Sequence, residues 1–317
     1  MNDTKTKKFS VFVKKNISLA AFIVLFIAFS FTTGGRFFTA NNLLTICGAS
    51  MDLLVTALGA TFIGMLGSID LSAGSMIALN GVVAVKVYVA TSSLPLSVLA
   101  AIAVSMMCYL IVIIAHTQLE VPTFICSLGM LSIARAVVTR ISLGTITMLP
   151  YDSPFKRIFG LRPDILIIGL ILFLVALLIE KYTLFGRYTR LIGGDEVVAR
   201  MSGINVNRQK IMVFLLAGFM TAIGGIIMAA RIGSGSPSVG DGYELNVISA
   251  VVLGGTSQRG GIGGVRGTLI GALTLTMLAN GLVLWGMPSE VQLLLKGIVL
   301  VLAVFITQER GTGAVVK

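Results

Sequence analysis

The sequence predicts an all-α, polytopic integral membrane protein. Of its 317 residues, 56% are hydrophobic and only 12% are charged, whereas soluble globular proteins carry about 25% charged residues. The mean hydropathy is +0.98. The apolar residues also form long blocks, and a membrane-spanning helix needs about 20 consecutive, mostly apolar residues. Together these observations exclude an ordinary water-soluble enzyme of one or two domains.

About ten apolar blocks follow one another along the chain, and each is expected to form a transmembrane helix. The eighth block is too short to span a bilayer unaided, so we expect a half-helix or a re-entrant segment there. No polar segment is long enough for a separate domain, so residues 1–317 are predicted to form a single transmembrane domain. The blocks lie near residues 17–33, 43–66, 73–90, 95–116, 123–142, 163–180, 210–230, 244–256, 265–285 and 291–307.

The basic residues predict the orientation of the chain in the membrane. With a cytoplasmic N-terminus, fifteen lysines and arginines fall on cytoplasmic segments and five fall outside, as the positive-inside rule requires. Residues 1–15 then form a cytoplasmic basic tail, and the loop 182–209 and the C-terminus are cytoplasmic too. The net charge of +11 is therefore explained by orientation rather than by a nucleic-acid partner. The outward cluster Lys156–Arg162 is the exception to this pattern.

Motifs for enzyme chemistry are missing from the sequence. The only histidine is His116, so neither a histidine-based metal site nor a Ser/His dyad is available. The P-loop pattern is absent, because no Gly-Lys dipeptide occurs. The glycine-rich run 260–267 departs from GxGxxG at Arg266. We therefore expect no cofactor, no bound metal and no ATPase activity in this chain, and an intramembrane enzyme is disfavoured.

Two glycine-broken regions occupy corresponding places in the two halves of the chain. Residues 61–79 and 249–273 each consist of an apolar block, a Gly/Ser break on the inner side and a second apolar block. Paired interrupted helices of this kind predict an internal repeat and point to the binding region of a transporter. Within the second region, Gly263, Gly267 and Gly271 form a small-xxx-small stripe that predicts tight helix packing.

Polar residues inside or next to the apolar blocks are candidates for a translocation path. Asp70 and Ser72 precede the third block, where capping of the helix start is favoured over substrate contact. Asp52 lies in the middle of the second block, and an ionisable residue at membrane depth is a functional candidate by default. It is expected to face either a water-filled cavity or a polar partner such as Asn80 or Lys296.

The loop 182–209 contains the signals of one short, charged helix. Asp195 or Gly194 is expected to begin it, and Gly203 is expected to end it. A capped polar helix in a cytoplasmic loop has no role towards lipid. The residues alone leave two interpretations open, which are docking to a cytoplasmic partner and a solvated helix without a role.

Four stretches resemble the ribose-type permease subunits of bacterial ABC importers. They occur in the order expected for that family and, with the hydropathy profile, cover nearly the whole chain. Two departures stand out: Val197-Val198 replace two small alanines, and Asp52 replaces an uncharged polar residue. The stretches are SIDLSAGS (68–75), VPTFICSLGM (121–130), GYEL followed by AVVLGGTS (242–257) and GGDEVVARMSGI (193–204).

The resemblance implies a permease of the inner membrane that transports a monosaccharide and catalyses no reaction itself. Its expected partners are a second permease copy, a cytoplasmic ABC ATPase, a periplasmic sugar-binding protein and the surrounding lipid. ATPase coupling is assigned to Gly193, Gly194, Glu196, Ala199, Arg200 and Gly203. The translocation path or gate is assigned to Asp52, Asp70, Ser72, Asn80, Tyr243 and Asn246. The alternatives are a branched-chain amino-acid ABC permease and a gradient-driven secondary carrier.

Overall fold

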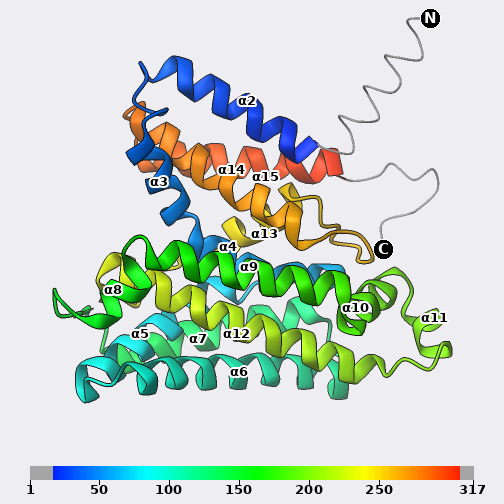
Figure 1. Ribbon diagram of the computed structural model, residues 1–317. Helices are drawn as coiled ribbons and strands as arrows, with labels where there is room; N and C mark the ends of the chain where they lie inside the picture. Colours follow the sequence, from blue (N-terminus) through cyan, green and yellow to red (C-terminus); the bar gives the residue numbers. More distant parts are fainter. Residues whose placement is uncertain (1–16, 308–317) are drawn as a thin grey trace, which may run out of the picture.

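The computed structural model describes residues 17–307 and is almost entirely helical (Figure 1). The basic tail predicted at residues 1–15 lies outside the described residues, as do residues 308–317. The all-α prediction is confirmed, because each of the ten apolar blocks contains at least one helix. The strands β1 and β2 are two residues long and pair antiparallel as a small ribbon.

The helices of the apolar blocks are α2 (Ile17–Thr32), α3 (Ala40–Ala49) with α4 (Met51–Met65), α5 (Ala73–Thr91), α6 (Leu94–Leu119), α7 (Thr123–Ser142), α9 (Asp164–Tyr182), α12 (Val206–Ile232), α13 (Tyr243–Leu253), α14 (Val265–Leu284) and α15 (Ser289–Thr307). The connections contain α8 (Pro154–Gly160), α10 (Leu184–Gly194), α11 (Glu196–Met201), β1 (Thr147–Met148) and β2 (Ser234–Gly235).

Within residues 17–307, six helices are long and apolar enough to cross a membrane. The second block differs from the expected single helix, because the chain bends by 41° between α3 and α4. Counting this bent pair as one broken span gives seven, while α2 and α13 are apolar but shorter. A polytopic membrane protein is therefore supported, whereas ten full crossings stay a prediction that helix length does not establish.

The helices form two layers. Helix α12 lies at the centre of the first layer, where it packs against α4, α5 and α6. Fourteen of the fifteen residues of α4 are buried. Glycines permit the close approach: a Cβ added at Gly59 would lie 2.8 Å from Cα of Ala217, and one added at Gly225 would lie 2.8 Å from the Ile77 carbonyl oxygen. Such small-residue contacts hold helices together in lipid, which supplies no hydrophobic driving force between them.

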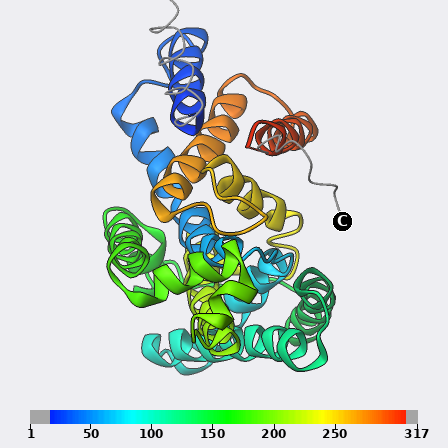
Figure 2. The ribbon, with the colours of Figure 1, turned by 90° about the vertical axis from the view of Figure 1, so that its right-hand side faces the viewer.

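A second layer contains α2, α3, α14 and α15 (Figure 2). It contacts the first layer through α13, which lies between α14 and α4, and through α14 itself, which packs on α4 and α9. A Cβ added at Gly267 would lie 1.8 Å from the Gly254 carbonyl oxygen, and one at Gly271 would lie 2.0 Å from that of Ala250. The predicted packing stripe is thus confirmed for these two glycines. Gly263 lies outside the helix, since α14 begins at Val265.

The first glycine-broken region reaches deeper into the bundle than predicted. Asp70 accepts a hydrogen bond from the Tyr109 hydroxyl (2.6 Å), and that hydroxyl lies 3.1 Å from the Thr221 hydroxyl. Tyr109 and Thr221 lie near the middle of the long helices α6 and α12. The break therefore carries Asp70 to the level of the middle of α6 and α12.

A second irregular segment inside the bundle, residues 236–242, connects β2 to α13. The Arg135 guanidinium donates hydrogen bonds to two of its carbonyl oxygens, at 2.6 and 3.1 Å. Gly240 packs directly on Gly74 at the start of α5, because a Cβ at Gly240 would lie 2.2 Å from the Gly74 carbonyl oxygen. The eleven-residue helix α13 is the half-helix expected for the eighth block, and α5 and α13 begin close together inside the bundle.

Candidate functional site

The short helix predicted in the loop 182–209 is present as α11. The Asp195 carboxylate caps it by accepting hydrogen bonds from the amides of Val197 (2.9 Å) and Val198 (3.0 Å). Gly203 follows the last turn with φ +79°, a left-handed conformation that favours glycine. The predicted start and stop residues of this helix are therefore both confirmed.

Glu196 holds α11 against the bundle instead of pointing outward. Its carboxylate binds Lys210 at 2.8 Å and Arg200 at 3.0 Å, and the Lys210 ammonium also lies 3.2 Å from His116 Nε2. Partial burial alone would raise the pKa of Glu196, but the hydrogen bonds and charges of Lys210 and Arg200 outweigh it and lower that pKa. The carboxylate is thus charged at neutral pH and engaged within the chain.

Three apolar side chains of α11 are exposed beside the exposed Arg200. Val197, Val198 and Met201 have exposed fractions of 67%, 57% and 82%, whereas Ala199 is buried against the chain. A cavity of about 480 Å³ lies beside them, between α10–α11 and the turn at residues 260–262. The cavity is lined by Arg190, Leu191, Gly194, Asp195, Val198, Ala199, Ser202, Ile204, Gly260, Gly261 and Ile262. Of the three exposed apolar side chains only Val198 lines this cavity, and exposed apolar groups of this kind are suited to contact another protein.

Three backbone segments converge where α10 ends. The Gly261 amide donates a hydrogen bond to the Met65 carbonyl (2.9 Å), and a Cβ at Gly193 would lie 1.8 Å from that same carbonyl oxygen. Gly194, the next residue, has open space around its Cβ position. The two predicted coupling glycines therefore differ: Gly193 sits in a three-way backbone contact, and Gly194 does not.

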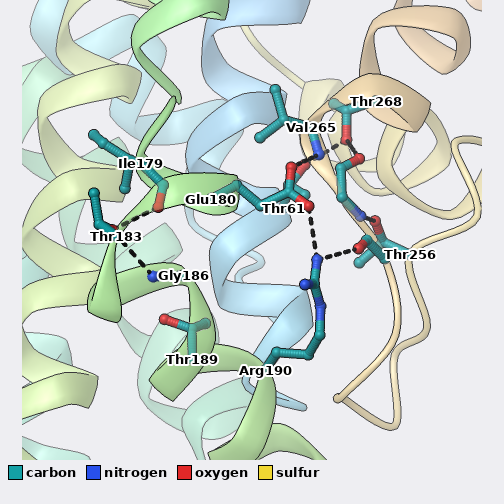
Figure 3. A network of polar contacts seen from close by, with 12 residues as sticks. Thr61, Ile179, Glu180, Thr183, Gly186, Thr189, Arg190, Thr256, Val265 and Thr268 are labelled. Carbon is teal, nitrogen blue, oxygen red and sulfur yellow. Dashed lines mark hydrogen bonds and ion pairs between the residues drawn. The ribbon is translucent and has the colours of Figure 1, made fainter. Parts of the chain in front are cut away.

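Sequence reasoning missed a buried carboxylate at the end of α9 (Figure 3). Glu180 pairs with Arg190 of α10 at 2.7 Å and accepts a hydrogen bond from the Val265 amide at 2.9 Å. Its side chain is only 12% exposed. In the sequence it is an ordinary charged residue at the end of an apolar block, and the partner at Val265 is a backbone group that leaves no signal.

Asp52 lies in the first turn of α4, where it is 3% exposed and fully paired. Its carboxylate forms an ion pair with Arg231 at the end of α12 and accepts a hydrogen bond from the Tyr243 hydroxyl (2.8 Å). Asn80 was suggested from the sequence as a polar partner of Asp52, and that suggestion is wrong, because the partners are Arg231 and Tyr243. The side chain of Lys296 lies outside the described residues. Asp52 and Tyr243, predicted separately, are thus brought into one cluster.

Asp70 and Ser72 form a separate cluster. The Asp70 carboxylate accepts hydrogen bonds from the Ser72 amide (2.8 Å) and hydroxyl (2.6 Å). The Ser72 side chain makes no capping hydrogen bond to α5, and Asp70 binds the amide of Ser72 just before the helix rather than an amide of its first turn. Asn80 donates to Ser105 (3.1 Å), and within the described residues its Oδ1 is buried without a partner. Asn246, in α13, is partly exposed.

The chain is similar to known membrane permeases. The family described as branched-chain amino acid transport system / permease component matches residues 42–304. The ribose import permease protein of Escherichia coli K12 is 37% identical, over 92% of this chain and 93% of that protein. The corresponding protein of Haemophilus influenzae is 33% identical over 98% of each chain. The xylose transport system permease protein of Escherichia coli K12 is 29% identical, over 91% of this chain and 90% of that protein. No solved structure matches the chain.

Proposed function

Because this chain belongs to the family of branched-chain amino acid transport system permease components, we propose that it is the membrane-spanning permease subunit of an ATP-driven (ABC) sugar importer. The observation that carries the proposal is its 37% identity to a ribose import permease over nearly the whole length of both proteins. The substrate is a monosaccharide delivered by a periplasmic binding protein. The permease resides in the inner membrane and performs no chemistry, since ATP is hydrolysed by a separate subunit.

Uptake into proteoliposomes tests this function. The permease is purified with its ATPase and supplied with its binding protein, and uptake of radiolabelled D-ribose and D-xylose is measured with and without ATP. ATP-dependent uptake of either sugar is expected. ATP-dependent uptake of leucine instead would identify the branched-chain amino-acid permease that the family description names. Uptake without ATP or partner subunits would identify a gradient-driven carrier.

ATPase docking is assigned to α11 and the cavity beside it. The apolar side chains of Val197, Val198 and Met201 are exposed at the end of the molecule that carries the short helices α10 and α11. Glu196 orients this surface through Lys210 and Arg200 rather than contacting the ATPase itself. A second permease copy places two such surfaces side by side, one for each of two ATPase modules.

The translocation path is assigned to the irregular segments before α5 and α13. Interrupted helices whose N-termini lie inside a bundle are typical of transporter binding regions, and α5 and α13 begin next to each other at Gly74 and Gly240. The path or gate residues are Asp52, Asp70, Ser72, Asn80, Tyr243 and Asn246. The cluster of Asp52, Arg231 and Tyr243 joins α4, α12 and α13, which suits it to act as a closed gate between these helices.

Substitution of Gly203 tests the coupling assignment. Gly203→Val forces a β-branched residue into the left-handed region (φ +79°), at a cost of about 1–2 kcal/mol. A Cβ there meets nothing within 4 Å, so only the backbone is strained. We expect the permease to stay in the membrane while ATPase co-purification and sugar uptake both fall.

Gly203→Asn is the matched control, since asparagine tolerates the left-handed conformation, and it should retain most docking and uptake. Normal docking together with normal uptake in the valine variant would place the coupling contact elsewhere, for example in the 257–264 turn.

Cysteine labelling tests the orientation. Helices α8 and α11 lie at opposite ends of the molecule (Figure 1). Met201→Cys lies in α11 and Tyr151→Cys lies shortly before α8, and the parent side chains are 82% and 83% exposed. In a variant lacking the native cysteines, a membrane-impermeant maleimide should label position 151 on intact cells. Position 201 should react only after permeabilisation. Labelling of 201 on intact cells would reverse the topology.

A further inference from the structure

We propose that Glu180 and Arg190 are positioning residues for energy coupling, because their ion pair makes α10 and the attached α11 move as one body with α14. The inference rests on the proposed function. One carboxylate serves two elements: its Oε1 binds Arg190 of α10 (2.7 Å) and its Oε2 accepts the amide of Val265, the first residue of α14 (2.9 Å). Figure 3 shows both contacts from the same side chain.

The sequence around the start of α14 explains why a carboxylate from another helix is needed. The residue before α14 is Gly264, which has no side chain to cap the helix. A carboxylate at a helix N-terminus binds the unpaired amides and is stabilised by the helix dipole. Glu180 supplies that group, and it lies so close that a Cβ on Gly264 would be 2.6 Å from its Oε1. Arg190 adds a hydrogen bond to the Gly263 carbonyl (3.1 Å).

The ion pair differs in kind from the glycine contacts next to it. The close contact between Gly193 and Met65 resists compression but not separation, because van der Waals attraction between two atoms is weak. A charge-assisted hydrogen bond at 2.7 Å resists separation. An ATP-driven cycle must move α11 in both directions, so a link that also pulls is required. We assign that pulling link to Glu180 and Arg190.

Beyond the ion pair, the contacts continue to the proposed gate. Helix α14 packs on α13 through Gly267 and Gly271. Tyr243, at the start of α13, donates a hydrogen bond to Asp52 of α4. A displacement of α10 that moves α14 therefore also moves α13 and the cluster of Asp52, Arg231 and Tyr243.

The experiment compares sugar transported with ATP hydrolysed in proteoliposomes that contain the full complex. Glu180→Gln keeps an oxygen that accepts the Val265 amide but loses the charge, and Arg190→Gln removes the cation. We expect both variants to retain ATPase co-purification and phosphate release, while D-ribose taken up per ATP falls about tenfold, as the loss of a charged hydrogen bond predicts. Arg190→Lys should restore part of the ratio. Arg187→Gln is the matched control, because Arg187 lies on the same helix but is exposed.

Two outcomes would overturn the inference. One is an unchanged ratio of ribose to ATP in both glutamine variants. The other is a parallel loss of complex, ATP hydrolysis and uptake, which indicates a purely structural ion pair.

Hydrogen exchange gives a readout that does not depend on the sugar. In the unmodified complex, ATP should change the protection from hydrogen exchange of residues 265–268 and of α11 together. In Arg190→Gln, it should change the protection of α11 alone. Identical changes in the two proteins would contradict the proposal. If the unmodified complex hydrolyses ATP without taking up sugar, the proposed function fails, and this exchange measurement still decides the role of the ion pair.

Discussion

Gly193→Ala is expected to reduce sugar uptake by at least about tenfold, although it adds only one methyl group. A Cβ at this position would lie 1.8 Å from the Met65 carbonyl oxygen and 2.7 Å from the Gly261 amide nitrogen. Both are backbone atoms, so no side chain can rotate away, and the methyl group would also separate the Gly261–Met65 hydrogen bond. Overpacking of this kind costs about 1–3 kcal/mol or more, and we expect uptake to fall by at least about tenfold.

Gly194→Ala is the matched control for that experiment. Its Cβ meets nothing within 4 Å, and alanine in a helix is more stable than glycine by up to about 1 kcal/mol. Uptake should therefore stay near that of the unmodified protein. Permease in the membrane is quantified beside uptake for both variants. Normal uptake by Gly193→Ala, or an equal loss in Gly194→Ala, would show that the three-way contact is not needed for coupling.

The pair of glycines shows what the sequence could predict at the coupling surface and what it could not. The stretch 193–204 identified both glycines as candidates for coupling. The helix start at Asp195 and the helix end at Gly203 follow from local chemistry alone. The difference between Gly193 and Gly194 depends on the Met65 carbonyl, which comes from a segment more than a hundred residues away. Local patterns carry no information about such contacts.

The same limit separates the helices from the buried clusters. Each of the ten apolar blocks found from hydropathy contains at least one helix, because lipid and the protein interior both demand apolar side chains. The bend between α3 and α4 was missed, since it interrupts the helix without interrupting the apolar block. Arg231 was counted as an outward loop residue, and its pairing with Asp52 spans 179 positions. Charge counts assign a side of the membrane to an arginine but do not identify its partner.

Asp52→Asn is expected to reduce the amount of folded permease. The Asp52 carboxylate is 3% exposed and neutralises Arg231, whose side chain is 30% exposed. Removing one partner of a fully buried ion pair leaves an uncompensated charge and costs about 3–5 kcal/mol, and the cost here is lower because water reaches part of the Arg231 side chain. Total stability is of order 5–15 kcal/mol, so even a discounted loss is measurable. Membrane yield and thermal stability of the purified protein in detergent measure the effect.

The double variant Asp52→Asn with Arg231→Gln separates lost charge balance from lost contact. It removes both charges and leaves neutral side chains of similar size, and replacing a whole buried ion pair is often nearly neutral. We therefore expect yield and thermal stability to recover towards those of the unmodified protein. Asp241→Asn is the matched control, because Asp241 pairs with Arg135 (2.9 Å) but is 68% exposed, and exposed pairs contribute only about 0–1 kcal/mol.

Uptake per folded permease then decides whether the cluster also acts as a gate. If the double variant folds normally but transports poorly, the charges of Asp52 and Arg231 are needed during the cycle, as expected for a gate that opens by parting α4 from α12. If it folds and transports normally, the cluster only stabilises the closed bundle, and Asp52 leaves the list of path residues. Normal yield of the single variant Asp52→Asn would contradict the ion pair itself, since an unpaired Arg231 beside buried helices cannot be free of cost.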